Sequence, residues 1–243
     1  MIATFTDFGG NGPYLGQVRA VLHQQAPGVA VVDLFPDLPA YNVQAAAYLL
    51  PAYSQYLPRG CVCLCVVDPG VGSDRAAVAV QADGRWYVGP DNGLLSQVVR
   101  RASSVTAFEI TWRPEGLSAS FHGRDLFAPV CAMLAGGGSV PGQPIDSQAL
   151  LSADWPADLC EVVYIDHYGN AVTGFRAQQL STRSGIEIAG VRCERRRTFS
   201  EAGSQRPFWY ANANGLVEIA VANRSAAAVL NLAIGDAFEV TLA

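Results

Sequence analysis

Short apolar runs alternate with stretches of helical periodicity along the first 135 residues, and this alternation limits the folds that the chain can adopt. Apolar runs rich in β-branched residues occupy residues 2–8, 29–35 and 61–67, and stretches of helical periodicity occupy residues 14–27 and 42–57. Strands that alternate with helices predict an α/β domain with a layered, largely parallel sheet.

The second half of this region adds antiparallel strands to the prediction. Residues 76–81 and 85–89 are two short apolar runs joined by a turn at Ala82–Gly84, which predicts a hairpin. The sheet is therefore expected to be mixed. Three more elements follow in the pattern: a helix at 91–102, a strand at 104–110 and a helix at 125–137.

The carboxy-terminal part has a different pattern, with short strands, turn residues and hardly any helical periodicity. Strands are expected within residues 161–175, 184–191, 215–225 and 235–243. The pattern predicts an all-β barrel domain. We expect an α/β domain at 1–138, a linker at 139–157 and the barrel at 158–243. The charged stretch 192–199, RCERRRTF, is interpreted as a solvated strand or hairpin.

Composition excludes several function classes. The net charge is −5 and all 16 basic residues are arginine, so the chain has no lysine for a phosphate-binding loop or a Schiff base. The acidic balance argues against a nucleic-acid partner. No apolar run approaches the roughly 18 residues of a membrane span, and the amino terminus lacks a signal-peptide pattern. We expect a cytoplasmic protein with no membrane partner.

The six cysteines do not show metal-ligand spacing. Cys61, Cys63 and Cys65 alternate along one strand and share a face. The other three, Cys131, Cys160 and Cys193, are scattered, and the chain contains no CxxC pair. We interpret the cysteines as small buried hydrophobic residues in a reducing compartment and expect no metal.

Two polar clusters follow predicted strands in the first domain, where α/β sheets bind ligands. Asp7 either caps a helix that starts near Gly12 or accepts the hydroxyls of a ribose. In VVDPGVGSDR, Asp68 and Arg75 form either a surface turn pair or a partly desolvated ion pair beside a ligand.

Two further clusters lie later in the chain. His122 in FHGRD precedes a predicted helix, so it is expected in a loop, where it is either structural or catalytic. In YIDHYGN, Asp166, Tyr168 and Asn170 sit in a predicted hairpin whose Tyr-Gly-Asn sequence is ordinary turn chemistry.

Taken together, six ordered motifs between residues 6 and 223 resemble the S-adenosyl-L-methionine hydrolase (adenosine-forming) family, which is related to the fluorinase and chlorinase enzymes. They are TDFG, VVDPGVGSDR, GPDNGLL, FHGRDLFAP, IDHYGN and NANGLVEIAVAN. The resemblance implies hydrolysis of S-adenosyl-L-methionine (SAM) to adenosine and methionine, with SAM as the substrate and no cofactor. It also implies a homotrimer or a dimer of trimers, with the ligand between the barrel of one subunit and the α/β domain of its neighbour.

The resemblance assigns a catalytic triad to Asp68, Arg75 and His122. The halogenating relatives carry tyrosine at 68, threonine at 71, tyrosine at 122 and serine at 123. This chain has Asp68, Val71, His122 and Gly123, and all four differences count against a halogenase.

By the same resemblance, a second set of residues lines the substrate site. The set is Asp7 (ribose hydroxyls), Tyr41 (sugar face, tryptophan in relatives), Asp166 (methionine ammonium), Tyr168 and Phe199 (adenine faces), Asn170 (adenine edge), Glu218 and the Val221 backbone (nucleoside pocket), and Ala213 (serine in relatives).

Two alternative functions remain open at this point. One is a protein or sensor that binds adenosine or SAM with negligible turnover. The other is a halide-dependent adenosyl transferase, which the four differences above disfavour.

Overall fold

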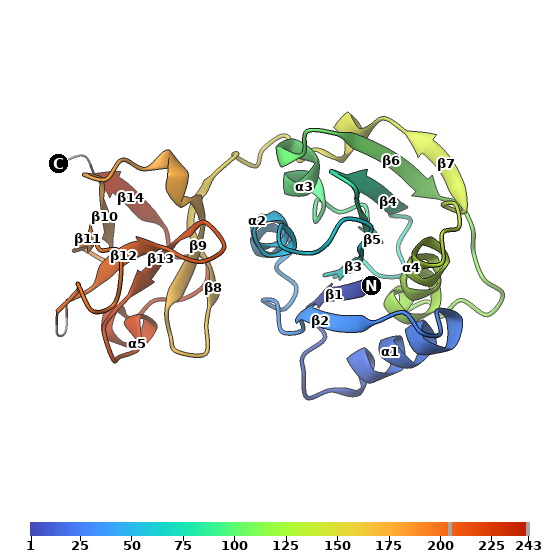
Figure 1. Ribbon diagram of the computed structural model, residues 1–243, viewed down its shortest axis with the longest axis horizontal. Helices are drawn as coiled ribbons and strands as arrows, with labels where there is room; N and C mark the ends of the chain where they lie inside the picture. Colours follow the sequence, from blue (N-terminus) through green and yellow to red (C-terminus); the bar gives the residue numbers. More distant parts are fainter. Residues whose placement is uncertain (204–205, 242–243) are drawn as a thin grey trace. The chain divides into compact units, whose positions relative to one another are not determined.

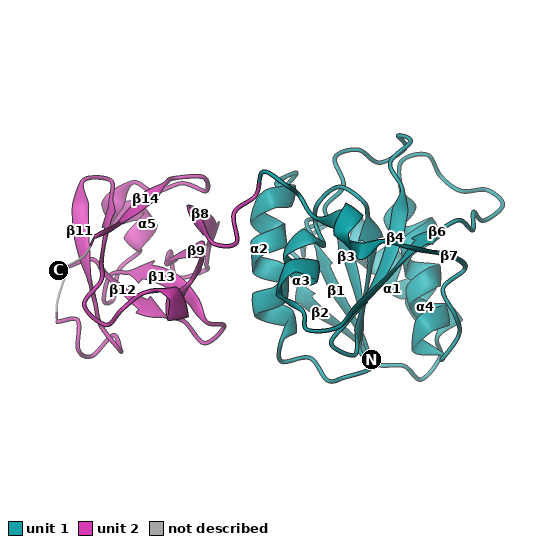
Figure 2. Ribbon diagram, turned by 90° about the horizontal axis from the view of Figure 1, so that it is seen from above, with its two compact units in different colours: residues 1–154 teal, residues 155–243 magenta. Residues whose placement is uncertain are grey.

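The computed structural model describes residues 1–203 and 206–241. The chain forms two compact units, residues 1–154 and 155–243 (Figures 1 and 2). None of the helices in the described part is long and apolar enough to cross a membrane.

Unit 1 contains a seven-stranded sheet with the order β2-β1-β3-β5-β4-β6-β7. Its strands are β1 (Ile2–Thr6), β2 (Val31–Phe35), β3 (Val62–Val66), β4 (Ala77–Ala82), β5 (Arg85–Pro90), β6 (Val105–Ile110) and β7 (Gly142–Ile145). Strand β1 pairs in parallel with β2 and β3, and β3 pairs in parallel with β5. The other three pairs are antiparallel.

The expected mixed sheet is confirmed, but the expectation that it is largely parallel is wrong, because only half of the pairings are parallel. The cause is the β4–β5 hairpin. Its turn residues Asp83 and Gly84 both have positive φ, at 47° and 80°, which reverses the chain tightly. Strands β6 and β7 then continue antiparallel on the far side of β4.

Helices cover both faces of this sheet. Figure 2 shows α1 (Pro13–Gln25) and α4 (Ala128–Ala135) on one face, with α2 (Val43–Ser54) and α3 (Ser96–Arg101) on the other. The interior strand β3 is buried along its whole length, as its unbroken apolar sequence predicts. A π-helical turn, Gly123–Phe127, precedes α4.

Strand β7 lies inside the segment that the sequence suggests as a linker. It pairs with β6 at the edge of the sheet, where its proline is tolerated. Gly142 fits there because a Cβ would lie 1.9 Å from the carbonyl oxygen of Glu109.

Unit 2 is a strongly curled seven-stranded sheet with the order β14-β10-β11-β12-β13-β9-β8. Its strands are β8 (Leu159–Ile165), β9 (Ala171–Arg176), β10 (Gly185–Ile188), β11 (Val191–Arg195), β12 (Phe208–Ala211), β13 (Leu216–Ala220) and β14 (Phe238–Thr241). Residues 242–243 of the last predicted strand lie outside the described residues. A bridge between Glu161 and Ala237 brings the first and last strands together.

The expectation of an all-β barrel is corrected in two respects. The barrel is only partly closed, because a single isolated bridge links its first strand to the segment before β14 in the described part of the chain. The unit also contains a short helix, α5 (Ala226–Leu230), capped by the Ser225 hydroxyl, which accepts from the Ala228 N–H at 3.0 Å.

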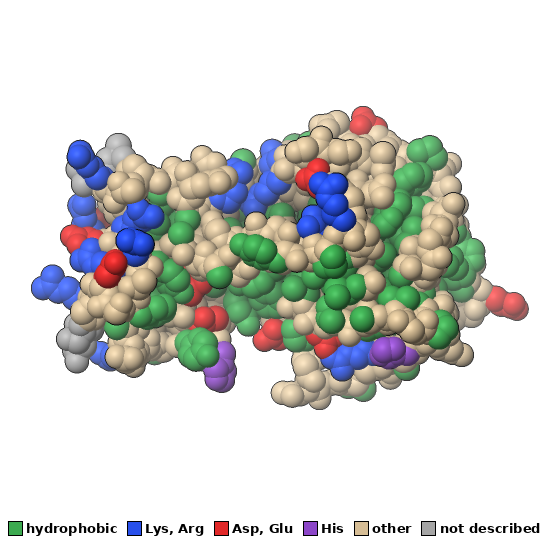
Figure 3. All heavy atoms as spheres, viewed as in Figure 1, with side chains coloured by type: hydrophobic (Ala, Val, Ile, Leu, Met, Phe, Trp, Pro, Cys, Tyr) green, Lys and Arg blue, Asp and Glu red, His purple; other side chains and the backbone are tan. Residues whose placement is uncertain are grey.

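The interpretation of RCERRRTF as a solvated strand or hairpin is confirmed for residues 192–195, whereas residues 196–199 lie outside the strand. Residues 191–195 form β11, in which Cys193 is buried while Arg192 and Glu194 are exposed. Figure 3 shows arginine side chains gathered on the visible face of unit 2 with acidic side chains among them. A mixed-charge surface of this kind fits a solvated sheet face.

Candidate active site

Asp68 and Arg75 form a buried ion pair at the carboxyl end of β3. Arg75 Nε donates to Asp68 Oδ1 at 2.9 Å, and Arg75 Nη2 donates to Asp68 Oδ2. The two side chains are only 4 % and 10 % exposed. This burial contradicts the alternative of a solvated surface pair.

His122 completes the predicted triad, but it lies in helical conformation at the N-cap of the π-helical turn and not in the expected loop. Arg75 Nη2 lies 3.0 Å from His122 Nδ1. A guanidinium has no acceptor, so Nδ1 is the acceptor and the neutral ring carries its proton on Nε2. Burial, followed by the positive charge of Arg75, lowers the pKa of His122, which also favours the neutral ring. Arg75 also lies over the ring of Phe127, with its guanidinium carbon 5.3 Å from the ring centroid.

Asn92 holds the strand end that carries Asp68. Its Nδ2 donates to the carbonyl oxygen of Val67 at 2.9 Å, and its Oδ1 accepts from the Leu94 N–H at 3.2 Å. The motif GPDNGLL contains Asn92, but the sequence alone did not assign this residue a role. The glycine-flanked amide after a predicted strand was the signal that could have identified it.

A cavity of about 670 Å³ adjoins the triad in unit 1, and Asp7, Tyr41 and Asp68 are among the residues that line it. The Tyr41 N–H donates to Asp7 Oδ2 at 3.0 Å. Helix α1 has Gly12 at its N-cap with no side-chain cap, so Asp7 does not cap this helix. Burial raises the pKa of Asp7, and the nearby charge of Asp68 adds to the effect.

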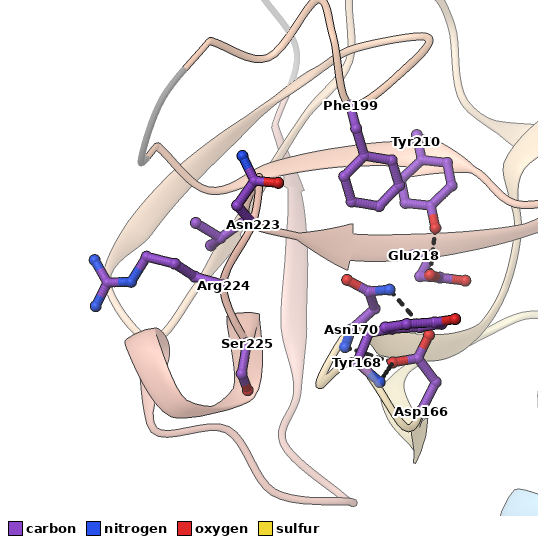
Figure 4. Close-up of a pocket in the computed structure, with 10 residues that line it drawn as sticks. Asp166, Tyr168, Asn170, Phe199, Tyr210, Glu218, Asn223, Arg224 and Ser225 are labelled. Carbon is purple, nitrogen blue, oxygen red and sulfur yellow. Dashed lines mark hydrogen bonds between the residues drawn. The ribbon is translucent and has the colours of Figure 1, made fainter.

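A second cavity, of about 660 Å³, lies entirely within unit 2 (Figure 4). It brings together six of the seven unit 2 residues that the family resemblance assigned to the substrate site, namely Asp166, Tyr168, Asn170, Phe199, Glu218 and Val221. Tyr210, Asn223, Arg224 and Ser225 also line it and were missed. Ala213 lies in the turn between β12 and β13 and is not among the described residues that line the cavity.

The Asp166 carboxylate organises the turn between β8 and β9. Its Oδ1 accepts from the backbone N–H groups of Tyr168 at 2.9 Å and Asn170 at 2.8 Å. Its Oδ2 accepts from Asn170 Nδ2 at 2.9 Å. Gly169 is required here, because φ is 82° and a Cβ would lie 2.0 Å from the Ser225 hydroxyl.

The described residues contain no cluster of three or more His, Cys, Asp or Glu side chains that could hold a metal ion. The cysteines are free thiols, and five of the six are buried. Burial raises the pKa of Cys65 and Cys131, so these thiols stay protonated.

Both units match the domains of one protein family. Residues 2–142 match the SAM hydroxide adenosyltransferase N-terminal domain, and residues 160–239 match the corresponding C-terminal domain. The chain belongs to the SAM hydroxide adenosyltransferase family.

Relatives within this family are named as hydrolases. The chain is 41 % identical to the (R)-S-adenosyl-L-methionine hydrolase of Thermus thermophilus, with 95 % of each chain covered. It resembles a solved structure of a conserved hypothetical protein from Thermus thermophilus, with a TM-score of 0.79, 38 % identity and 99 % of each chain covered. A Thermotoga maritima structure has a TM-score of 0.87 at 27 % identity, again with 99 % of each chain covered.

Fluorinases are more distant from this member of the SAM hydroxide adenosyltransferase family. The fluorinase of Actinopolyspora mzabensis is 25 % identical, with 99 % of this chain and 97 % of the relative covered. The family resemblance implies a serine in the halogenating relatives at the position of Gly123. A Cβ on Gly123 would lie 2.8 Å from Phe8 Cζ, so the side chain of Phe8 would have to move to admit a serine.

Proposed function

We propose that this protein hydrolyses SAM to adenosine and L-methionine by in-line attack of water at C5′. The observation that carries the proposal is the buried Asp68–Arg75–His122 cluster, in which Asp68 also lines the unit 1 cavity. The names of the relatives support SAM as the substrate.

The charge on the substrate determines where a carboxylate is useful. SAM is a sulfonium, so the positive charge on sulfur fades as the C5′–S bond breaks and its electron pair returns to sulfur. A carboxylate against the sulfur would stabilise the ground state more than the transition state and would slow the reaction. We therefore place Asp68 on the side of the attacking water.

The hydrogen bonds leave Asp68 as the only base among the three residues. Arg75 remains protonated, and the acceptor nitrogen of His122 is occupied by Arg75. Asp68 uses one lone pair on each oxygen for Arg75 and keeps the others. As the water oxygen bonds to C5′, Asp68 takes the proton of the water, while His122 Nε2–H acts as a donor.

The unit 2 cavity suits the nucleoside. Tyr168 is 76 % exposed and Phe199 is 43 % exposed, so both rings are available to stack on a planar base. Asn170 and Glu218 line the same cavity and can pair with the edge of the base. In unit 1, we assign Asp7 to the ribose hydroxyls and Tyr41 to the sugar face.

We further propose that the substrate is the (R)-epimer at sulfur, because the hydrolase relatives are named for that epimer. The family resemblance also supports a homotrimer or a dimer of trimers. Separated epimers assayed in parallel test the first point, and sedimentation velocity tests the second.

The decisive experiment incubates the purified protein with SAM, with and without chloride, and quantifies nucleosides and methionine. We expect equal amounts of adenosine and methionine, independent of halide. Asp68→Ala should lower turnover by at least about 10²-fold, the scale of a general base, while adenosine binding remains. Asp74→Ala is the matched control, because Asp74 is an exposed aspartate in the same loop.

Three other outcomes would contradict parts of the proposal. Unchanged turnover in Asp68→Ala removes Asp68 from the mechanism. Intact SAM together with tight adenosine binding would indicate a nucleoside-binding protein, an alternative that the self-contained aromatic cavity of unit 2 favours. A 5′-halogenated nucleoside formed with chloride or fluoride would indicate a halide-dependent adenosyl transferase.

A further inference from the structure

Glu218 is a carboxylate buried in the wall of the unit 2 cavity, and two side-chain donors hold it. It lies on the interior strand β13 and is 5 % exposed. Tyr210, directly opposite on β12, donates its hydroxyl to Oε1. Asn212 Nδ2 donates to Oε2 at 2.9 Å. Figure 4 shows the Tyr210 hydroxyl pointing at Glu218.

The amide of Asn212 has only one orientation that fits its surroundings. Its Oδ1 accepts from the backbone N–H groups of Asn214 at 2.9 Å and Leu216 at 3.0 Å. The NH₂ group must therefore face Glu218. Each carboxylate oxygen has a fixed donor, so the Glu218 side chain is held in one rotamer while further lone pairs remain for a ligand.

Asn170 is oriented in the same way from the neighbouring strand. Because its Nδ2 donates to Asp166, its Oδ1 is an acceptor and one N–H remains free to donate. Asn170 directly precedes Ala171, which pairs with Ile219 next to Glu218. The cavity wall therefore presents acceptors from both residues and a single donor from Asn170.

This arrangement matches one class of purine. The exocyclic amine of a 6-aminopurine supplies two N–H donors for the acceptors, and an adjacent ring nitrogen accepts from the Asn170 N–H. A 6-oxopurine would place its oxygen against the Glu218 carboxylate. The acceptors that the exocyclic amine serves would then face an oxygen. A 6-oxopurine also carries a hydrogen on N1, where a 6-aminopurine has an acceptor, so that edge would oppose the Asn170 N–H, which is a costly mismatch in a buried site.

We propose that Glu218 selects a 6-aminopurine over a 6-oxopurine, and that Tyr210 and Asn212 are positioning residues that hold it in place. The inference rests on the proposed function and specifies which base this cavity accepts. Tyr210 and Asn212 act through Glu218 and need not touch the ligand.

The pH at which Glu218 becomes protonated is a useful readout, because it would not change if Tyr210 and Asn212 had only a structural role. Burial raises the pKa of Glu218, the hydrogen bonds from Tyr210 and Asn212 lower it, and the negative charge of Asp166 raises it. Arg224 also lines the cavity, but it points away from Glu218 (Figure 4). Loss of the Tyr210 hydroxyl should therefore raise the pKa of Glu218. The carboxylate would then become protonated, and stop acting as an acceptor, at a higher pH.

The test compares adenosine and inosine binding to the full chain by calorimetry between pH 5 and pH 8. We expect the wild type to prefer adenosine by at least about 10²-fold. Glu218→Gln can turn its amide to donate, so it should reduce this preference by at least about tenfold. Glu187→Gln is the matched control, because Glu187 is an exposed strand glutamate of unit 2.

Tyr210→Phe keeps the ring. As pH is lowered, adenosine affinity should fall at a higher pH in this variant than in the wild type (the acid limb of the binding profile), with little change in affinity at pH 8. The inference is overturned if Glu218→Gln retains the wild-type preference, or if Tyr210→Phe leaves the acid limb in place. If Glu218→Gln does not fold, the Tyr210→Phe profile decides alone. SAM hydrolysis is assayed separately, so a failed hydrolase proposal and a failed base preference give different results.

Discussion

The backbone N–H of Tyr41 donates to Asp7 Oδ2 at 3.0 Å, although the two residues lie 34 positions apart in the chain. Tyr41 has a φ of 63°, a left-handed conformation that a bulky residue adopts only when its surroundings hold it there. The hydrogen bond supplies that support. Asp7 therefore serves the unit 1 cavity in two ways, by fixing Tyr41 and by presenting its second oxygen.

Substitution of Asp7 separates these two roles. Asp7→Ala should raise KM for SAM by at least about tenfold, because a ribose acceptor and the support for Tyr41 are lost together. Asp7→Asn keeps an oxygen for the Tyr41 N–H and should have a smaller effect. Steady-state kinetics measure both, with Asp154→Ala as an exposed control. Equal KM values for wild type and Asp7→Ala would refute the assignment.

The tautomer of His122 can be observed directly by ¹⁵N NMR. We expect protonation on Nε2 at neutral pH, because Nδ1 accepts from Arg75. The pKa is lowered by burial and by the charge of Arg75, so the neutral ring should persist below the ordinary midpoint of about 6.5 as pH falls. The contribution of His122 to turnover should therefore be lost only at pH values below that midpoint. A midpoint above 6.5, or protonation on Nδ1, would contradict the geometry.

Arg75 and Asp68 should be strongly coupled in stability. Arg75→Met leaves a buried carboxylate without its partner and should lower the free energy of unfolding by about 3–5 kcal/mol. Asp68→Leu/Arg75→Met should recover most of that loss and remain inactive. Urea denaturation of the single and double variants measures the coupling. Arg196→Met, which breaks the solvent-screened pair with Glu194, should lower the free energy of unfolding far less than Arg75→Met does. A similar loss for both single arginine variants would argue against a coupled buried pair.

The sequence predicted the elements whose signal is local. Strand β3 is apolar at every position and buried at every position, and the hairpin turn at Asp83–Gly84 was also evident. Strands β7 and β12 were missed, and the sequence of β7, GQPI, contains glycine and proline, which are typical of turns. Strand β7 also depends on a close approach of Gly142 to the Glu109 carbonyl, and no local sequence pattern predicts this contact.

In the candidate active site, too, residues with a local sequence signal were predicted and contacts between distant segments were missed. Asp68 and Arg75 lie in the glycine-containing loop after β3, and His122 lies at the N-cap of the π-helical turn Gly123–Phe127; the structure brings the three side chains together as the resemblance implied. Tyr210 was missed because its role depends on cross-strand register, which places it opposite Glu218. The contact between Asp7 and Tyr41 was missed because it joins two separate loops.

Asn92 offers the sharpest test of how the triad is held. Its amide N–H fixes the Val67 carbonyl directly before Asp68, whereas its oxygen serves the Leu94 N–H. Asn92→Asp keeps the oxygen and loses the donor, so Asp68 should become less well placed and kcat should fall by about tenfold, with KM nearly unchanged. Stopped assays at saturating SAM measure this, and Gln24→Ala on the exposed face of α1 is the amide control. If kcat stays at the wild-type value in Asn92→Asp while the protein remains folded, the Val67 carbonyl does not need this donor and the loop itself positions Asp68.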